Sequence, residues 1–449
     1  TIVWLPIATA TDYLDPATFK SNAPGNYGSD SRPYSQTVYE ASPLNRVSKQ
    51  YGEGAAWYGG HGQEAEYTVN TTASPLNCIR YTAGDTGTLT SHGNFAANLL
   101  NVVKSTDEDG NTSYTFTDKL GRTVLVRQMK GIETHDTYSV YDDWGNLRFV
   151  LQPMYQSSSN LEQHTFQYRY DGQGRCIYKK LPGAQYMEYA YNIAGMLTFS
   201  QDGNQRAQGT PKWTYYLYDT FGRLAQQGEC TGKNASSNTV VHVQNYYDDY
   251  GFVGGTGFPS GQFPLDTSGY GKGELTGSVI TVPGSGTKLY VAHYYDIKGR
   301  EVKTVQGNIL GGYDVTSTVY TFTDKPATVT HTHTASGKDS RTEAYTYSYD
   351  HADRLSKVEH TLGGAKVTLA AYVYDNLGRL QSKSLHGSDA NKQTYTYNVR
   401  NWLTGISGSK FTQNLYYNTG NGVAKYNGSI SSMTWKAGTE STVRGYKFT

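Results

Sequence analysis

The chain has 449 residues, of which 37% are apolar and 17% charged, and its formal net charge is +1. This balance excludes a disordered chain, and the near absence of net charge argues against a general affinity for nucleic acid or anionic membranes. Tyrosine is the unusual residue, with 41 copies against 13 Phe and 6 Trp. Because tyrosine favours strands and carries a hydroxyl beside its ring, this composition favours large, partly hydrated sheets.

Residues 1–90 hold Tyr, Ser, Gly and Pro in irregular order and no recognisable repeat. We predict a lead-in segment that is partly stranded. The first residues lack the basic region and cleavage pattern of a signal peptide, and no run approaches the ~20 apolar residues of a membrane span. Within residues 93–104 several apolar residues have helix-like spacing, but a strand that enters the first repeat is favoured over a short helix.

A motif, Tyr-Asp-x-x-Gly-Arg-Leu, recurs through residues 117–425. The best copies begin at Tyr218 and Tyr374; close copies begin at Tyr141, Tyr170, Tyr191, Tyr247 and Tyr295, and weaker ones at Thr117, Thr323, Tyr349 and Tyr397. Their second residues recur every 21–29 residues, except for the 48 residues between Asp248 and Asp296, where we expect a degenerate repeat. Such self-similarity predicts a repeat protein in which each repeat packs on its neighbours.

Each repeat is expected to be a β-hairpin with the motif at its turn. Tyr recurs at every second position before the motif, which places the rings on one face of a strand. The Asp suits the first turn position, the Gly suits a position with positive φ, and the Arg suits a place over a neighbouring Tyr ring or beside an Asp of the next repeat. The turn residues predicted to be structural are Tyr141, Asp142, Gly145, Tyr170, Asp171, Gly174, Arg175, Tyr218, Asp219, Gly222, Arg223, Tyr295, Asp296, Gly299, Arg300, Tyr374, Asp375, Gly378 and Arg379.

Three consecutive repeats carry the clearest tyrosine rows, and we predict that these rings line one enclosed face: Tyr347, Tyr349, Tyr372, Tyr374, Tyr395 and Tyr397. Adjacent hairpins in register would align them into ladders. The opposite face is expected to carry Lys357, Gln381 and Lys383 and to meet solvent.

Residues 251–286 are rich in glycine, and we expect an insertion in the wall here rather than a phosphate-binding loop, because a strand-like run follows where such a loop needs a helix. His331 and His333 lie on one face of a predicted strand, yet no Cys or carboxylate pattern completes a metal site. Cys78, Cys176 and Cys230 match no metal spacing and are expected to be small apolar strand residues; a Cys176–Cys230 bridge stays open for an oxidising compartment. We therefore predict no metal and no other cofactor.

The repeats closely resemble the YD repeats of Rhs-type proteins, of the B and C components of insecticidal toxin complexes and of the teneurin shell. The resemblance covers about 117–425, and residues 42–47 and 416–422 are similar to Rhs proteins of Bacteroides-type bacteria. It implies an all-β fold in which hairpins form a long curved antiparallel sheet that spirals into a hollow shell or barrel. The Asp-Pro-x-Gly-Leu signature that ends such shells is missing, since the sole Asp-Pro is Asp15-Pro16.

The resemblance implies a structural shell, not an enzyme, which encloses or presents a C-terminal toxin or effector domain absent from this chain. The implied partners are that domain and further shell chain or a second copy, and the implied location is secreted or at the cell surface of a bacterium. We expect a lead-in segment at 1–90, the repeat shell at 91–425 and a truncated continuation at 426–449. Two alternatives stay open: a surface module that binds carbohydrate or mediates adhesion through tyrosine rows, and a hydrolase on a β scaffold.

Overall fold

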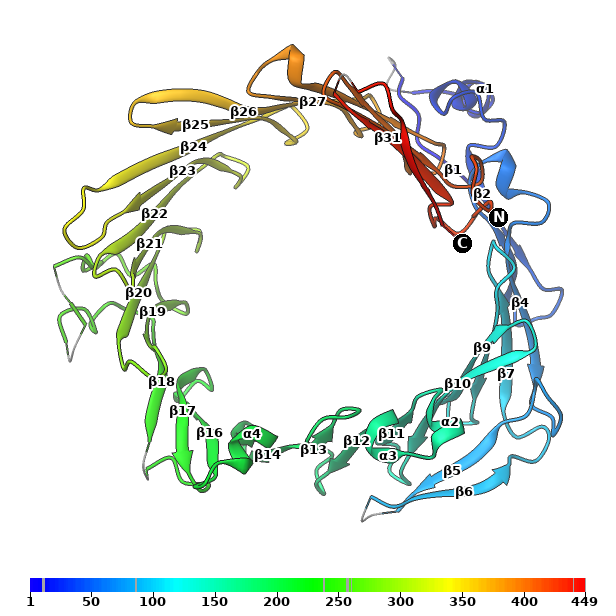
Figure 1. Ribbon diagram of the computed structural model, residues 1–449, viewed down its shortest axis with the longest axis horizontal. Coiled ribbons are helices and arrows are strands. Elements are labelled where there is room, and N and C mark those ends of the chain that lie inside the picture. The colour runs from blue at the N-terminus through cyan, green and yellow to red at the C-terminus, as the bar shows by residue number, and fades with distance from the viewer. Residues whose placement is uncertain are drawn as a thin grey trace. The chain divides into compact units, whose positions relative to one another are not determined.

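The protein folds almost entirely as antiparallel β-hairpins placed side by side (Figure 1). The computed structural model describes residues 1–9, 13–84, 87–236, 239–255, 258–259, 261–438 and 440–448. Among these residues, 30 strands belong to one sheet and the strands β5 and β6 form a separate pair. The predicted all-β fold with successive hairpins in one antiparallel sheet is confirmed.

The first of two compact units contains residues 1–168 and 372–449. Its helical segments are α1 (Pro16–Asn26), α2 (Tyr155–Ser158) and α3 (Leu161–His164), with short 3₁₀ turns at Ala55–Trp57 and Asp389–Asn391. Its strands are β1 (Ile2–Trp4), β2 (Tyr34–Tyr39), β3 (Val47–Tyr51), β4 (Gln63–Val69), β5 (Ile79–Ala83), β6 (Leu89–Asn94), β7 (Asn101–Thr106), β8 (Thr112–Thr117), β9 (Thr123–Lys130), β10 (Glu133–Tyr141), β11 (Leu147–Leu151), β27 (Leu380–Leu385), β28 (Lys392–Tyr397), β29 (Leu403–Gly408), β30 (Phe411–Tyr416), β31 (Ser432–Ala437) and β32 (Arg444–Lys447).

The second unit contains residues 169–371, and the boundaries between the units fall within β12 (Thr165–Tyr170) and β26 (Ala365–Tyr374). It holds the short helix α4 (Gly203–Ala207). Its strands are β13 (Cys176–Lys180), β14 (Met187–Tyr191), β15 (Leu197–Gln201), β16 (Lys212–Tyr218), β17 (Leu224–Thr231), β18 (Val240–Tyr247), β19 (Leu275–Thr281), β20 (Lys288–Tyr295), β21 (Glu301–Gly307), β22 (Tyr313–Tyr320), β23 (Pro326–His333), β24 (Arg341–Tyr349) and β25 (Leu355–Leu362).

A β-bulge precedes the motif tyrosine in hairpin after hairpin. In β16–β17 the register shifts between Leu217 and Tyr218, and in β24–β25 it shifts between Ser348 and Tyr349. The same shift stands at Tyr141, Tyr191, Tyr247, Tyr295, Tyr320 and Tyr397. A bulge adds one residue to one strand and increases the local twist. The repeated bulge therefore gives each hairpin the same bend next to its turn.

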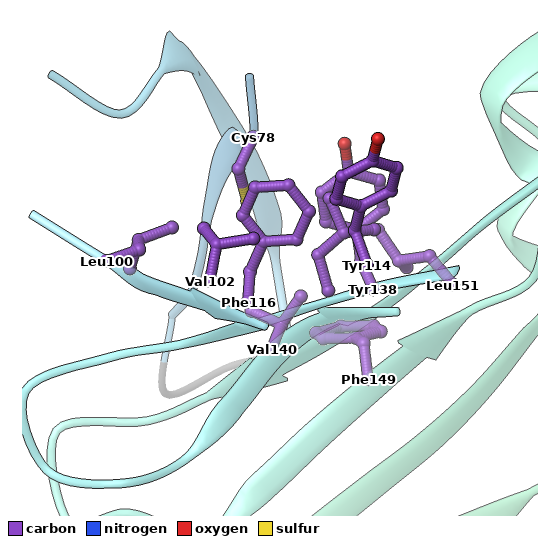
Figure 2. Packing of buried hydrophobic residues seen from close by; sticks show 10 residues of the cluster. Cys78, Leu100, Val102, Tyr114, Phe116, Tyr138, Val140, Phe149 and Leu151 are labelled. Carbon is purple, nitrogen blue, oxygen red and sulfur yellow. The ribbon is translucent and has the colours of Figure 1, made fainter. Parts of the chain in front are cut away.

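The largest apolar cluster of the first unit lies under the β5–β6 hairpin. Figure 2 shows Cys78, next to β5, over the rings that rise from the sheet below, among them Phe116, Tyr138 and Phe149. Phe116 and Leu125 are fully buried. The buried ion pair of Arg127 with Asp136 helps to hold this cover, because Arg127 also donates to the Pro75 and Asn77 carbonyls before β5.

The glycine-rich segment after β18 supplies the cover in the second unit. Phe252, Phe258 and Phe263 pack on Tyr294 and Val305 of the sheet. Residues 256, 257 and 260 of this segment lie outside the described residues, and its last part is the strand β19. In its described part the segment continues into a strand and not into a helix, and it covers the sheet; that it is an insertion in the wall stays a prediction.

The covers pack on one and the same face of the repeats. Val140 and Tyr138, Ala292 and Tyr294, and Tyr215 are buried in three separate clusters, and each stands one or three residues before its motif tyrosine. Side chains two residues before the motif, such as Tyr347, point to the opposite face because strand residues alternate. We call this opposite face the tyrosine face.

The lead-in segment at 1–90 stays a prediction, although the structure describes most of its residues. Residues 93–104 form the end of β6, a turn and the strand β7, as favoured over a helix. Residues 1–84, however, already contain five strands and α1 in the described part, and one of their hairpins has the repeat design described below. The boundaries predicted at residues 90 and 425 stay a prediction.

Candidate functional site: the joint between repeats

The aspartate of the motif organises the hairpin turn. Asp219 Oδ1 accepts hydrogen bonds from the backbone N–H groups of Phe221 and Arg223, both at 2.9 Å. Its backbone N–H donates to the Arg223 carbonyl, and the Gly222 N–H donates to the Asp219 carbonyl. Asp171, Asp296, Asp350 and Asp375 make the same set of side-chain contacts. Each motif therefore lies at a turn whose polar backbone groups are satisfied locally.

The glycine of the motif provides the left-handed residue that this turn needs. Gly222 and Gly378 have φ of +80° and +86°, as predicted. Where the motif lacks glycine at this position, Asp324, Asp353 and Asn401 take φ of +64°, +58° and +59°. Asp and Asn tolerate this region better than other residues with a Cβ, so degenerate repeats keep the turn.

The arginine of the motif joins its own turn to the next repeat. Arg223 Nε donates to Asp219 Oδ2 at 2.7 Å, and its outer nitrogens donate to both oxygens of Asp248. Its guanidinium also lies 4.3 Å from the ring centre of Tyr247. Arg122, Arg175, Arg300 and Arg379 stack in the same way on Tyr141, Tyr191, Tyr320 and Tyr397. Both predicted roles of the arginine are thus present together.

The tyrosine hydroxyl of the motif makes a further contact to the preceding repeat, which was not predicted from the sequence. We call the Asp, Arg and Tyr contacts that fix one repeat to the next the joint. Tyr218 donates to the Leu197 carbonyl at 2.8 Å, and Leu197 is the first residue of the returning strand in the preceding repeat. Equivalent bonds of 2.8–3.1 Å run from Tyr141, Tyr191, Tyr247, Tyr295, Tyr320, Tyr349, Tyr397 and Tyr417 to Thr123, Cys176, Leu224, Leu275, Glu301, Pro326, Leu380 and Leu403. Phenylalanine cannot make this bond, which explains why these nine positions hold Tyr.

The protonation states suit the joint. The hydrogen bond from Arg175 lowers the pKa of Asp171 below its ordinary value, and that from Arg300 does the same for Asp296. Arg223 lowers the pKa of Asp248 to about 2. Burial raises the pKa of the Tyr218 hydroxyl, and it raises that of Tyr295 to about 12. At neutral pH the carboxylates accept and the hydroxyls donate, as every bond of the joint requires.

One repeat stands in the lead-in segment, where the sequence showed none. Glu40 N–H donates to the Arg46 carbonyl, and Arg46 Nε donates to Glu40 Oε1 at 2.8 Å. The Arg46 guanidinium lies 4.0 Å from the ring centre of Tyr67, whose hydroxyl donates to the Val47 carbonyl. The arrangement is that of the motif, with Glu in place of Asp and a turn two residues longer.

The weak copy expected at Thr323 was placed wrongly. The turn begins three residues earlier, because Thr321 N–H donates to the Lys325 carbonyl and Thr321 Oγ1 accepts from the Lys325 N–H. Tyr320 is therefore the motif tyrosine, and Asp324 takes the glycine position. A further turn of this kind, at Asp107–Asn111, precedes the first predicted copy.

The predicted tyrosine rows divide into two kinds. Tyr347, Tyr349, Tyr395 and Tyr397 share the tyrosine face by alternation within β24 and β28, but the hydroxyls of Tyr349 and Tyr397 donate to the preceding repeat, whereas those of Tyr347 and Tyr395 do not. All six predicted rings are half-buried. The expectation for the other face was wrong in part: Lys357 lies opposite Ser348, away from Tyr347, but Lys383 lies opposite Gln393 and so shares the face of Tyr395. Gln381, two residues from Lys383 on the same strand, shares that face too.

In the first unit a cluster that we call the clasp joins segments far apart in the sequence: Trp57, Arg400, Trp402 and Tyr426. Trp57 is buried against Trp402, and its indole N–H donates to the Tyr426 carbonyl at 2.8 Å. Arg400 lies over both indole rings. Its guanidinium approaches the carboxylates of Glu53 and Glu108, each at 3.8 Å.

The residues considered for other chemistry are engaged elsewhere. His331 contacts the Thr316 hydroxyl, and His333 contacts the Asp314 carboxylate. Within the described ranges no group of three or more His, Cys, Asp or Glu is placed to hold a metal ion. Cys176 and Cys230 are free thiols, so the bridge left open is not formed.

Comparisons with known proteins give one family model for the start of the chain and solved structures that cover most of it. Residues 1–71 match a family model described as a domain of unknown function, DUF6443. No curated protein matches. Solved structures that match include "Crystal Structure of TcdB2-TccC3-Cdc42", with 12% identity, a TM-score of 0.38 and 92% of this chain covered, and "Crystal Structure of TcdB2-TccC3 without hypervariable C-terminal region", with 13% identity, a TM-score of 0.38 and 92% covered. The chain spans 22% of each of those chains. No helix among the described residues is long and apolar enough to cross a membrane.

Proposed function

We propose that this chain is a structural wall: a non-enzymatic, Rhs-like shell segment that encloses or presents another polypeptide. The observation that carries the proposal is the repeated joint. Its Asp, Arg and Tyr recur from repeat to repeat, and in each full copy all three bind the turn or the neighbouring hairpin. A catalytic residue is needed once in each active site, whereas a residue that fixes one repeat to the next is needed in every repeat. The joint thus has the distribution expected of a structural device.

The difference between the two faces supports a container. The chain places its own apolar covers on the face opposite to the tyrosine face. The tyrosine face keeps rings such as Tyr347 and Tyr372, each half-buried. Rings with hydroxyls offer both apolar area and hydrogen bonds to a guest without selecting one sequence. We propose that this face is the enclosed one, lined by Tyr347, Tyr349, Tyr372, Tyr374, Tyr395 and Tyr397.

The proposed guest is a C-terminal toxin or effector domain of the same polypeptide, and the proposed location is secreted or at the bacterial cell surface. Both come from the resemblance of the motif to Rhs-type repeats. In this proposal the wall itself needs no cofactor.

Electron cryo-microscopy of the complete native polypeptide tests the proposal. We expect a hollow wall with Tyr347, Tyr372 and Tyr395 on its inner side and extra density within. Rings on the outer side would refute the container. A glycan array distinguishes the alternative: saturable binding of one glycan class that is lost in Tyr347→Ala and Tyr372→Ala, and kept in Tyr446→Ala, would assign the tyrosine face to carbohydrate binding instead.

A further inference from the structure

One motif turn of the clasp, the turn after β28, carries a buried charge. Val399 and Arg400 occupy its free positions, which are the two x residues of the motif between the first turn residue and the left-handed one. Val399 is 6% exposed. Arg400 Nη1 is buried and has no hydrogen-bond partner in the part of the chain that the structure describes. A guanidinium that leaves water in this way needs a compensating environment.

Two indole rings and two carboxylates supply that environment. The guanidinium carbon of Arg400 lies 5.2 Å from the ring centre of Trp57 and 4.8 Å from that of Trp402. Arg400 Nε is 3.8 Å from Glu53 Oε2, and Arg400 Nη2 is 3.8 Å from Glu108 Oε1. These distances are too long for hydrogen bonds, so the ring faces and the nearby negative charges hold the arginine. A planar, weakly hydrated guanidinium suits such a site, whereas the compact, strongly hydrated ammonium of lysine does not.

Two glycines of the lead-in segment leave space for this turn. A Cβ on Gly52 would lie 2.7 Å from the guanidinium carbon of Arg400, and a Cβ on Gly54 would lie 2.8 Å from Cγ1 of Val399. Gly54 also has a φ of +104°, which by itself favours glycine, but Gly52 has no positive φ. The need for glycine at position 52 therefore comes from the arginine.

Glu108 belongs to a second motif turn, Asp107–Asn111, which precedes β8. Both free positions of this turn are acidic, since Asp109 follows Glu108. Asp109 Oδ1 accepts a hydrogen bond from the Tyr426 N–H, and Asp109 Oδ2 lies 3.9 Å from Lys425 Nζ. An acidic turn from the first part of the chain thus meets basic residues from its last part.

The sequence sets these two turns apart from the others. Among the five-residue motif turns, only Asp107–Asn111 has two acidic free residues. An apolar free residue followed by a basic one occurs only in the turn with Val399–Arg400 and in the turn with Ile297–Lys298. Lys298 Nζ pairs with Asp324 at 3.0 Å within the second unit. The motif turns therefore offer a single apolar–arginine pair.

We infer that the acidic turn, Glu53 and Trp57 form a recognition site for a motif turn that presents an apolar residue followed by arginine. This site selects the repeat to which the start of the chain is fixed. A turn with uncharged free residues, such as Thr220–Phe221, would leave the buried carboxylate of Glu108 without a cation. Residues 52–57 lie in the region that matches the family model of unknown function, so part of that region gains a ligand of stated chemistry. The inference does not depend on the proposed wall function, because every contact lies within the chain.

Hydrogen exchange of the whole chain tests the inference at the amides of Gly54, Trp57 and Tyr58, which donate to backbone carbonyls. Arg400→Ala should speed their exchange at least tenfold, and Arg400→Lys should do the same because an ammonium does not stack between indole rings. Amides of β28 and β29 should keep their protection in both variants, as a sign that the hairpin itself stays folded. Lys298→Ala, the matched control at a free position of its own turn, should change neither region. Protection that survives Arg400→Lys would overturn the inference, since the site would then accept any cation.

A second measurement leaves Arg400 in place. Gly52→Ala sets a methyl group against the guanidinium. It should therefore speed the same exchange at least tenfold in the unchanged chain and have no further effect in Arg400→Ala. No effect of Gly52→Ala in the unchanged chain, or an equal effect in both backgrounds, would overturn the inference.

Discussion

Removing one hydroxyl from a joint measures what the joint contributes. In Tyr349→Phe the ring remains, and the bond of 2.8 Å to the Pro326 carbonyl is lost. A hydrogen bond contributes a net ~0.5–1.5 kcal/mol, and more is lost when the remaining partner stays unpaired out of water. Tyr349 is half-buried, so water reaches the carbonyl in part. We therefore expect a loss of about 1 kcal/mol in the free energy of unfolding.

The same strand supplies the control. Tyr347 is also half-buried in β24, and its hydroxyl has no hydrogen-bond partner among the described residues. Tyr347→Phe should therefore change stability by less than about 0.5 kcal/mol. Phe at Tyr218, Tyr349 and Tyr397 together should cost about 3 kcal/mol, because the three hydroxyls belong to separate joints.

Urea unfolding gives the total change, and hydrogen exchange gives its location. Repeat arrays often open locally, so amides of β23 and β24 should lose protection in Tyr349→Phe while those of β14 and β15 keep theirs. Equal losses in Tyr349→Phe and Tyr347→Phe would show that the rings, and not the hydroxyl bond, join the repeats. If neither variant lowers the free energy of unfolding, the tyrosine hydroxyl does not stabilise the contact between repeats.

Three further predictions concern the turn, the clasp and the response to pH. Gly222→Ala should cost about 1 kcal/mol or more in urea unfolding because φ is +80°, whereas Gly172→Ala, at a turn position without positive φ, should be neutral. Trp57→Ala should cost about 3–5 kcal/mol by the same measurement, while Trp144→Ala, at an exposed turn tip, should cost almost nothing. Burial raises the pKa of Tyr295 from 10 to about 12, so the contribution of its hydroxyl to the free energy of unfolding is complete below pH 10 and is lost as the pH rises from 10 to 12. Tyr295→Phe should therefore flatten the curve of stability against pH between pH 10 and 12. An unchanged slope would contradict the raised pKa of Tyr295.

The hairpins and their turns were predictable because their causes are local. Asp219, Gly222 and Arg223 stand within five residues, and Gly222 and Arg223 both make hydrogen bonds to Asp219 within the same turn. The acceptor of the tyrosine hydroxyl is different, since the Leu197 carbonyl is 21 residues before Tyr218. Every residue has such a carbonyl, so no side-chain pattern marks it.

The errors have physical causes too. Lys383 lies on the tyrosine face because it stands eight residues after Asp375, whereas Lys357 stands seven residues after Asp350, and successive strand side chains point to opposite faces. The copy that begins at Tyr320 was placed three residues too late because the Thr321 hydroxyl replaces the carboxylate as acceptor of the turn. The copy at Glu40 escaped because its turn is two residues longer, although its arginine and tyrosine contacts are the usual ones.

The clasp sets an order of events during synthesis. Trp57 leaves the ribosome more than 300 residues before Trp402 and Tyr426, the partners that bury it. At about 5–20 residues per second, an aromatic cluster made by the first part of the chain waits on the order of half a minute for its cover. A nascent chain stalled after residue 390 should therefore expose Trp57 to a soluble quencher, whereas one stalled after the complete clasp should not. The segment around Trp57 is thus synthesised early but reaches its native packing only when nearly the whole chain has been made.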